Sequence, residues 1–399
     1  MVGYLFLNIL GLVVFLGVAL LFSKHKKQIN WKSVGIMVAL NIFLAWFLIS
    51  FPVGRAIVNG AAYGFNWLVA TAYNGIGFAF SNEVHVKQMD FFVSALLPIL
   101  LVVPLFDILT YFNILPWMIK MLGKALSFIT GQPKFESFFA VEMMFLGNTE
   151  ALAVSSLQLK KMTEERDLTL GMMSMSCISA SIVGAYTQML PGQFVLTAIP
   201  LNIINSIIMT NILNPVTVPP EEDIIVQLKK GKKESFFSFL GDSILSAGKL
   251  ILIIAAMVIS FVALAALIDK LLALIAPWLS LESILGVIMF PFSFLLGLPV
   301  NEAFQTAQYM GTKLITNEFV VMGQISPIVK GFAPHMQAVV CTFLISFANF
   351  STLGMIIGCF KGLVEKKAVD LISANAGYLI LSGILVSLMS AGFVGLFSW

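Results

Sequence analysis

Charged residues are scarce in this chain. Only 11% of its 399 residues are Asp, Glu, Lys or Arg, while 59% are hydrophobic, and ordinary soluble domains have roughly 25% and 45–50%. A soluble enzyme or a nucleic-acid-binding protein could not cover so much apolar surface with so few polar side chains, and a disordered chain is less hydrophobic. The composition therefore predicts a polytopic membrane protein that is surrounded by lipid and has no nucleic-acid partner.

Cysteine is also rare, and the sequence shows no arrangement of reactive side chains. Cys177, Cys341 and Cys359 lie in apolar stretches without the spacing of a disulfide framework or a zinc site, so we expect them to be small packing residues. The chain has no paired-histidine metal motif, no glycine-rich phosphate loop and no nucleophile elbow. These absences predict that the protein is not an enzyme and has no cofactor.

Eight apolar stretches are long enough to cross a bilayer, which takes about 20 residues of helix. They cover residues 4–22, 33–53, 91–112, 168–190, 194–213, 250–268, 339–360 and 371–397. The lysine-rich loops after the first and seventh stretches and at residues 219–234 then fall on one side, which the positive-inside rule makes cytoplasmic. Both termini are accordingly predicted to lie outside. Residues 54–90 mix charged and aromatic side chains and predict amphipathic helices at the outer interface.

Two further apolar segments are interrupted in the middle. Residues 135–158 carry Asn148, Thr149 and Glu150 at their centre and have basic residues beyond both ends. Both ends therefore face the cytoplasm, and each half of about ten residues is roughly 15 Å long, half a hydrocarbon core. The pattern predicts a re-entrant helical hairpin. Residues 284–315 break around Pro299 and predict a second hairpin that enters from the opposite side.

The two hairpins begin two similar units. Each is followed by a span with a polar interruption, at residues 174–181 and 346–352, and then by one more span. An inverted repeat with broken helices is typical of secondary transporters, whose site lies near the midplane between the repeats. The predicted fold is all-α, with eight transmembrane helices, two re-entrant hairpins and interfacial helices. Because the chain lacks a nucleotide-hydrolysing domain, an ion gradient must drive any accumulation.

Several polar residues are candidates for a binding site. Glu150 and Glu302 are carboxylates in apolar surroundings, where a charge costs a few kcal/mol. Each either caps its own helix, whose positive end favours it, or accepts hydrogen bonds from a polar ligand. Two carboxylates without a nearby cation disfavour an anionic substrate. Asn349, Ser351 and Thr352 are either site residues or helix-packing residues.

Other polar residues near the hairpins are expected to have structural roles. Glu142 lies two turns before the tip of the first hairpin, where it is either a proton site or, as we expect, a solvated residue. Lys313, Asn317 and Glu318 form a cluster after the second hairpin, and the interpretation we favour for them is pairing that stabilises the fold.

Four motifs in order give the chain a family resemblance. They are Gly147-Asn148-Thr149-Glu150-Ala151, Gly297-Leu298-Pro299-Val300-Asn301-Glu302-Ala303, Thr312-Lys313-Leu314-Ile315-Thr316-Asn317-Glu318-Phe319-Val320 and Ser346-Phe347-Ala348-Asn349-Phe350-Ser351. With these motifs the sequence resembles the concentrative nucleoside transporter family, and it is most similar to the bacterial proton-coupled nucleoside permeases. The likeness runs through most of the chain and is densest from Phe135 onward.

The resemblance implies an architecture. Members are homotrimers in which a scaffold domain surrounds the threefold axis and a mobile transport domain works as an elevator. Residues 1–134 would be mainly scaffold, 135–215 the first transport-domain repeat, 216–280 the cytoplasmic loop and a scaffold span, and 281–399 the second repeat. The protein would lie in the plasma membrane of a bacterium, with its N- and C-termini outside.

The resemblance also assigns side chains to the two halves of a nucleoside. The nucleobase would contact Asn148, Thr149, Glu150, Ile182 and Phe347. The ribose would contact Glu302, Asn349 and Thr352. Many members have Gln in place of Asn148, and the shorter amide would have to be bridged by water or a shifted base. The substrates expected are pyrimidine nucleosides such as uridine, with adenosine as a further candidate.

The resemblance further bears on the coupling ion. In sodium-coupled members an Asn side chain and a Ser hydroxyl help to hold the ion, and by position these are Met143 and Cys177 here. Neither is a hard oxygen ligand, so the sequence predicts no metal site and coupling to H+, with Glu302 as the first candidate carrier and Glu150 as the second. A sodium-coupled nucleoside symporter and a symporter for another small uncharged solute are the alternatives.

Overall fold

The structure is a computed structural model and describes residues 2–80, 90–225 and 235–399. These residues form helices and no strand, which confirms the all-α prediction. Among them, the helices long and apolar enough to cross a membrane are Val2–Leu21 (α1), Trp31–Ile49 (α2), Phe92–Tyr111, Gly192–Leu213 (α12), Phe236–Ala273 (α13) and Ala376–Gly395 (α20). The third of these consists of η2 (Phe92–Leu96) and α5 (Ile99–Tyr111). The other two predicted spans are broken helices.

The predicted interfacial segment contains one long helix, α3 (Pro52–Ala79). Pro52 lies in its first turn, where a missing N–H needs no partner. Residues 81–89 of this segment, like 226–234 of the predicted cytoplasmic loop, lie outside the described residues. A further helix, α6 (Ile114–Thr130), follows α5 and ends at Gly131. The sequence did not predict α6, because its lysines interrupt the apolar run that marks a span.

Hairpin 1 consists of α7 (Lys134–Leu146) and α8 (Asn148–Val154), followed by the short α9 (Ser156–Leu159). Its arms meet at Gly147, whose φ of +95° suits only glycine. The next span is broken, with α10 (Glu164–Ser174) and α11 (Ala180–Met189) separated by residues 175–179. α12 follows, so the chain has the predicted order of hairpin, broken span and continuous span.

Hairpin 2 repeats this order after α13. Its arms are α14 (Leu281–Phe294) and α15 (Val300–Ile315), which pack along each other. The short α16 (Glu318–Ile325) and η3 (Val329–Gly331) lead to the second broken span, α17 (Pro334–Leu344) and α18 (Phe350–Leu363). α19 (Lys366–Ala374) then precedes α20. Both breaks coincide with the polar interruptions that the sequence shows.

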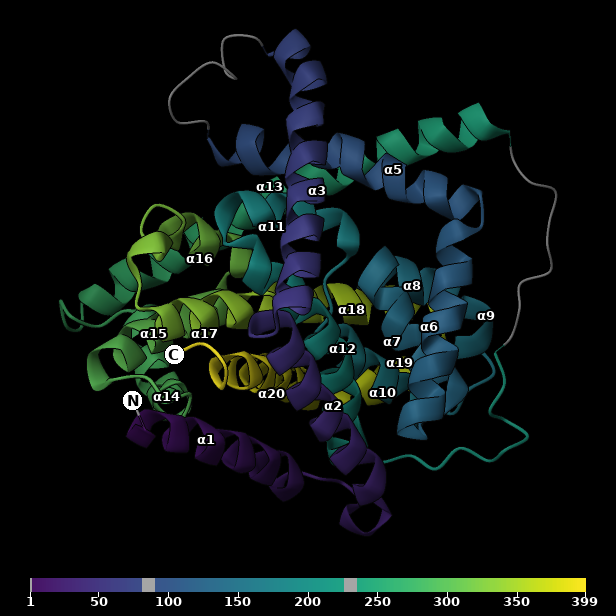
Figure 1. Ribbon diagram of the computed structural model, residues 1–399, viewed down its shortest axis with the longest axis horizontal. Coiled ribbons are helices and arrows are strands. Elements are labelled where there is room, and N and C mark those ends of the chain that lie inside the picture. Colours follow the sequence, from purple (N-terminus) through teal and green to yellow (C-terminus); the bar gives the residue numbers. More distant parts are fainter. Residues whose placement is uncertain (1, 81–89, 226–234) are drawn as a thin grey trace.

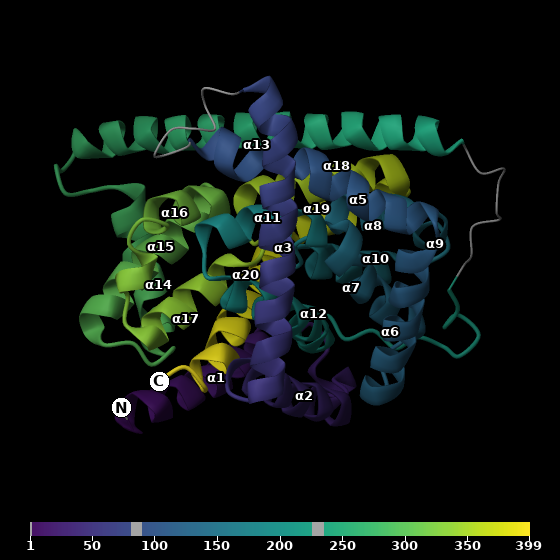
Figure 2. The ribbon, with the colours of Figure 1, turned by 45° about the horizontal axis from the view of Figure 1, so that its top comes forward.

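The core lies around α12, which contacts α20, α2, α3 and α7 and runs through the middle of the molecule (Figure 1). In its apolar window 83% of the residues are buried, against 6% for α13. α13 contacts chiefly α5 and extends as a long rod along one side (Figure 2). α1 and α2 pack on α12 and α20. This packing groups them with the two repeats, whereas the sequence-based boundaries assign residues 1–134 mainly to the scaffold, and those boundaries stay a prediction.

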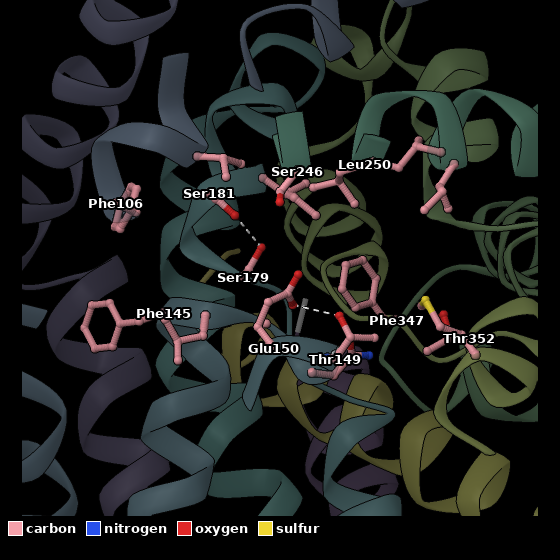
Figure 3. A pocket seen from close by; sticks show the side chains of 18 of the residues that line it. Phe106, Phe145, Thr149, Glu150, Ser179, Ser181, Ser246, Leu250, Phe347 and Thr352 are labelled. Atoms are coloured by element: carbon pink, nitrogen blue, oxygen red, sulfur yellow. Dashed lines mark hydrogen bonds between the residues drawn. The ribbon is translucent and has the colours of Figure 1, made fainter. Parts of the chain in front are cut away.

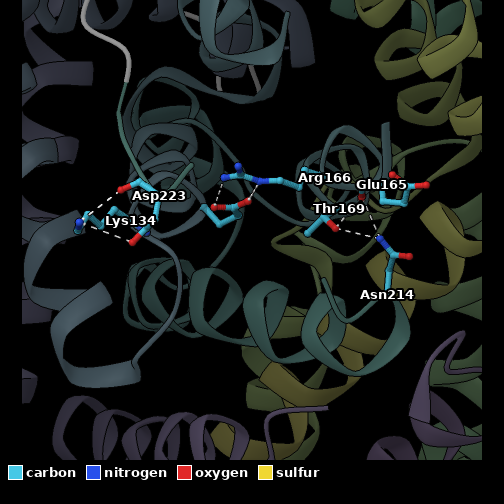
Figure 4. Close-up of polar contacts among 7 residues, drawn as sticks. Lys134, Glu165, Arg166, Thr169, Asn214 and Asp223 are labelled. Carbon is cyan, nitrogen blue, oxygen red and sulfur yellow. Dashed lines mark hydrogen bonds and ion pairs between the residues drawn. The ribbon is translucent and has the colours of Figure 1, made fainter. Parts of the chain in front are cut away.

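Buried polar contacts fix the first arm of hairpin 1 to the broken span (Figure 4). The Arg166 guanidinium donates to both carboxylate oxygens of Glu136, over 2.7 and 3.0 Å, and both side chains are buried. The Asn214 amide at the end of α12 donates to the Glu165 carbonyl and the Thr169 hydroxyl, each at 3.0 Å. A bidentate pair of this kind is geometrically specific, so the start of α10 is held firmly against α7 and α12.

A second network crosses the centre of the molecule. The Asn41 amide donates to Asn205 Oδ1 at 2.7 Å, Asn205 donates to Ser390 Oγ at 2.9 Å, and Ser390 donates to Asn202 Oδ1 at 2.6 Å. Asn202 in turn donates to the Ile345 carbonyl in the second break. The network links α2, α12 and α20 to the unwound segment, whose free carbonyls would otherwise be buried without partners.

Replacing Gly297 with Ala should destabilise the tip of hairpin 2. Gly297 has a φ of +83°, and an added Cβ would lie 2.6 Å from the Tyr4 carbonyl oxygen on α1. Backbone strain and this collision together should cost about 2 kcal/mol or more. Thermal unfolding of the purified protein in detergent measures the loss. Gly354→Ala is the control, because nothing lies within 4 Å of a Cβ there. Equal unfolding midpoints for the two variants would contradict the prediction.

Candidate functional site

A cavity of about 500 Å³ lies between hairpin 1, the two broken spans, and the helices α5 and α13. Figure 3 shows it from close by. Cavities of this size hold small organic ligands. Both repeats contribute to the wall, because the tip of hairpin 1 and residues 179–182 face residues 317–319 and 347–355 across it. The remaining wall comes from α5 and α13, including Asp107, Asp242 and Ser243.

The tip of hairpin 1 is built on the turn at Gly147. The turn lets α8 begin at Asn148, whose Oδ1 accepts from the Thr149 amide at 2.8 Å and whose Nδ2 donates to the Ser174 carbonyl at 3.2 Å. The Asn148 amide therefore caps the broken end of α10. Thr149 Oγ1 donates to Glu150 Oε2 at 2.7 Å, and the Glu150 side chain projects into the cavity (Figure 3).

The second break supplies the opposite wall. Asn349 begins α18, and its Oδ1 accepts from the Thr352 amide at 2.8 Å. Its Nδ2 donates to Glu318 Oε2 at 3.2 Å. Phe347 lies within the unwound segment and Thr352 in the first turn of α18, and both line the cavity. Because the helix is unwound here, consecutive polar residues of the span can point into the cavity. In a continuous helix only the residues on one face could do so.

Glu318 is the site residue that sequence reasoning missed. It is buried at the start of α16, lines the cavity, and accepts from Tyr186 Oη at 2.9 Å as well as from Asn349. The sequence prediction for this residue was structural pairing. Its motif, which continues through Asn317 and Phe319, was among the four that carry the family resemblance, and that was the available signal.

Glu302 does not lie at this cavity. Neither α14 nor α15 contributes to the wall, and Glu302 stands in the first turn of α15. The fourteen residues from Glu302 to Ile315 extend about 20 Å along the helix axis. The tip of hairpin 2 instead packs against α1 at Tyr4 and Asn8. Glu150 and Glu302 are each followed by Ala at a hairpin tip, but this likeness is local, since the carboxylate that reaches the cavity is Glu318, which begins α16 just beyond the other end of α15.

The structure brings together seven of the eight side chains assigned from the sequence. Those that line the cavity are Asn148, Thr149, Glu150, Ile182, Phe347, Asn349 and Thr352. Glu142, expected to be solvated, is instead buried and accepts from Ser155 Oγ at 2.9 Å. It does not line the cavity.

The positions compared with a sodium site carry sulfur. Met143 and Cys177 are both buried, and Ser174 Oγ lies 3.5 Å from Met143 Sδ. Within the described ranges, no group of three or more His, Cys, Asp or Glu side chains is arranged to hold a metal ion. Thioether and thiol sulfur are poor ligands for a hard alkali cation.

Two family models match the sequence. One, described as "Na+ dependent nucleoside transporter C-terminus", matches residues 194–395, and the corresponding N-terminus model matches residues 10–83. Over 396 residues the chain is 46% identical to the purine nucleoside transport protein NupG of Bacillus subtilis, covering 99% of this chain and 100% of that protein. It is 27% identical to the nucleoside permease NupC of Helicobacter pylori, over 98% of this chain and 97% of the relative.

The fold is also similar to solved structures. The structure of CNTnw in an inward-facing substrate-bound state superposes with a TM-score of 0.92 at 23% sequence identity, covering 99% of this chain and 98% of the other. A variant of CNTnw in an outward-facing state gives 0.93. With full-length sequence matches and this shared fold, the chain belongs to the concentrative nucleoside transporter family and is a nucleoside transporter, not an enzyme.

Proposed function

We propose that this protein is a symporter that imports nucleosides with H+ by alternating access of the cavity described above. The observation that carries the proposal is the convergence of amide, hydroxyl and carboxylate groups from both repeats on one cavity between hairpin 1 and the second break. Such groups match an uncharged ligand with several N–H and O–H donors.

In this proposal the nucleobase lies against the hairpin 1 tip and the ribose against the second break. Asn148, Thr149 and Glu150 face the base, and Ile182 and Phe347 provide its apolar contacts. Asn349 and Thr352 face the ribose. The ribose carboxylate is Glu318 in place of Glu302, because Glu318 already shares a hydrogen bond with Asn349 at this wall.

The surroundings proposed for the protein follow from its surface. Exposed apolar side chains occur along α13 from Phe237 to Leu271, and such a surface must meet lipid or other copies of the chain. We place the protein in a bacterial cell membrane as a homotrimer with α3, α5 and α13 as scaffold, against which the repeats move as an elevator. The N- and C-termini lie on one side of the molecule (Figures 1 and 2), which we take to be outside.

The proposal also names H+ as the ion that moves with the nucleoside. Its support is that sulfur-bearing Met143 and Cys177 occupy the positions compared with a sodium site, and that Glu150 lies in the cavity. Of the two carriers expected from the sequence, Glu302 lies away from the cavity, so Glu150 is the one we propose. The name of the matching family model, which refers to Na+, keeps sodium coupling as the alternative.

Vesicles containing the purified protein should accumulate labelled nucleoside when the outside is made acidic. One proton per nucleoside allows about tenfold accumulation per pH unit, because each unit is worth about 1.4 kcal/mol. An inward sodium gradient at equal pH should give no accumulation. A protonophore is the control, since it should abolish the first result. Accumulation driven by sodium alone would refute proton coupling and leave nucleoside transport standing.

A purine nucleoside is the substrate class that the comparisons favour over the expected pyrimidine. The B. subtilis relative, 46% identical along the whole chain, is named a purine nucleoside transport protein. A carboxylate such as Glu150 can also accept two adjacent N–H donors, which guanine presents on its Watson–Crick edge and uracil does not. We therefore propose guanosine among the preferred substrates on both grounds, and inosine because of the purine relative alone, since its base lacks the second N–H donor.

A competition panel tests the base preference. Unlabelled guanosine and inosine should inhibit uptake of labelled nucleoside at about tenfold lower concentration than uridine or cytidine, which corresponds to about 1.4 kcal/mol. Free bases and ribose should compete poorly, since each fills half of the site. Stronger competition by uridine would restore the pyrimidine prediction, and strong competition by an unrelated sugar would favour the alternative of another uncharged solute.

A further inference from the structure

Lys313 is a buried basic side chain that the proposed function does not use. Among the described residues, the buried Lys and Arg side chains are Arg166 and Lys313. Arg166 is neutralised by its bidentate bond with Glu136. Lys313 has 0% of its surface exposed, and the ion pairs found among the described residues do not include it. A buried ammonium is costly unless its N–H groups are hydrogen-bonded and its charge is balanced. The surroundings of Lys313 must therefore supply both acceptors and negative charge.

The Lys313 ammonium donates its hydrogen bonds to acceptors at the second break, where α17 ends. Its Nζ donates to the Phe343 carbonyl and to Ser346 Oγ, both at 2.7 Å, and lies 4.6 Å from the centre of the Phe343 ring. Phe343 is in the last turn of α17, where helix carbonyls lack intrahelical partners and the helix end is negative. The ammonium therefore caps the broken helix and satisfies its partial charge.

The first break is capped without a charge. There, the Asn148 amide donates to the carbonyl of Ser174, the last residue of α10. In both repeats a side chain from the preceding hairpin thus caps the broken span. Since a neutral amide suffices in the first repeat, capping alone does not require an ammonium in the second.

The charge of Lys313 has a counterpart at the cavity. Lys313 and Glu318 are both bonded to the short segment between α17 and α18, because Lys313 donates to Ser346 and Glu318 accepts from Asn349, although the ion pairs of the described residues do not join them. The side chains that donate hydrogen bonds to the Glu318 carboxylate, those of Tyr186 and Asn349, are both neutral. Within the described ranges, Lys313 is therefore the buried Lys or Arg side chain that is not already neutralised by a carboxylate, and it is the one that can balance the charge of Glu318.

We propose that Lys313 is a positioning residue of the nucleoside site, a tethered cation that holds the unwound segment between α17 and α18 in place and supplies the positive charge facing Glu318. It does not touch the ligand, because it does not line the cavity. The inference rests on the proposed role of Glu318 at the ribose. It explains why a costly charge is buried next to a break that a neutral group could cap.

Chemical rescue separates this role from a merely structural one. Lys313→Ala should bind nucleoside at least about tenfold more weakly than the wild type, measured by isothermal titration of the purified protein. Propylammonium at millimolar concentration should restore much of the affinity, and propanol should not, because it fills the space without the charge. Lys313→Arg should keep most of the affinity. The exposed Lys330→Met is the matched control and should bind like the wild type. Equal effects of propylammonium and propanol would overturn the proposal.

A stability cycle covers the case in which Lys313→Ala folds poorly. Lys313→Met alone leaves Glu318 without its counter-charge, whereas Lys313→Met combined with Glu318→Gln removes both charges. The double variant should therefore unfold at a higher temperature than Lys313→Met. If the double variant is no more stable than Lys313→Met, the two groups are not coupled and the proposal fails. Wild-type protein that binds no nucleoside would instead refute the proposed function itself.

Discussion

Glu318→Gln should weaken nucleoside binding by about 10- to 100-fold, while Glu302→Gln should leave it unchanged. A hydrogen bond to a carboxylate is worth about 1.5–3 kcal/mol, which gives this range. Glu318 lines the cavity beside Asn349, and Glu302 stands in the first turn of α15, away from the cavity. The amide keeps the shape of the carboxylate, so the change in affinity should come from the lost acceptor and charge.

Binding to purified protein by isothermal titration measures both effects. Thermal unfolding should accompany it, because Glu318 also accepts from Tyr186 and its loss affects stability. The deciding quantity is the dissociation constant of each variant relative to that of the wild type. If Glu302→Gln loses binding and Glu318→Gln keeps it, the ribose assignment made from the sequence is right and the one made from the cavity is wrong.

Glu150→Gln should abolish proton-driven accumulation and leave nucleoside exchange in place. A glutamine cannot take up and release a proton, but its amide keeps one oxygen that can accept from Thr149 Oγ1. Net accumulation requires the proton to move with the nucleoside, whereas the exchange of internal for external nucleoside does not. Accumulation should therefore fall to the equilibrium level.

Exchange is measured in vesicles loaded with unlabelled nucleoside. Proton-driven accumulation is measured in vesicles with an imposed pH gradient. Glu142→Gln is a matched control, since Glu142 lies in the same hairpin, is buried and does not line the cavity. It should accumulate nucleoside as the wild type does. Continued accumulation by Glu150→Gln would show that another group carries the proton, and loss in Glu142→Gln would point to that residue.

The hairpins and broken spans could be predicted because individual glycine, proline or polar residues interrupt the apolar runs where the helices break. Gly147 and Gly297 are the points where the chain turns with positive φ, and polar residues mark both unwound segments. α6 could not be predicted in the same way, because amphipathic helices lack a continuous apolar run. The packing of α1 and α2 on α12 and α20 depends on contacts between distant segments, which no local pattern encodes.

The site was predictable except for one carboxylate. The residues at the hairpin 1 tip and at the second break were found because each lies at a visible interruption. Glu302 was assigned to the ribose from the family resemblance, and Glu318 was given a structural role. A resemblance by position carries no information about distance. Only the length and direction of α15 decide that Glu318, at the start of α16, reaches the cavity and Glu302 does not.

The length of α13 limits how this helix can sit in a bilayer. Its 38 residues make a rod of about 57 Å, nearly twice the roughly 30 Å of hydrocarbon. Because apolar side chains are exposed along the whole rod, it must be steeply inclined, by roughly 60° from the membrane normal if fully embedded. A domain that moves along a helix inclined in this way is displaced within the membrane plane as well as across the membrane. Its movement would therefore rearrange the lipid at its edge.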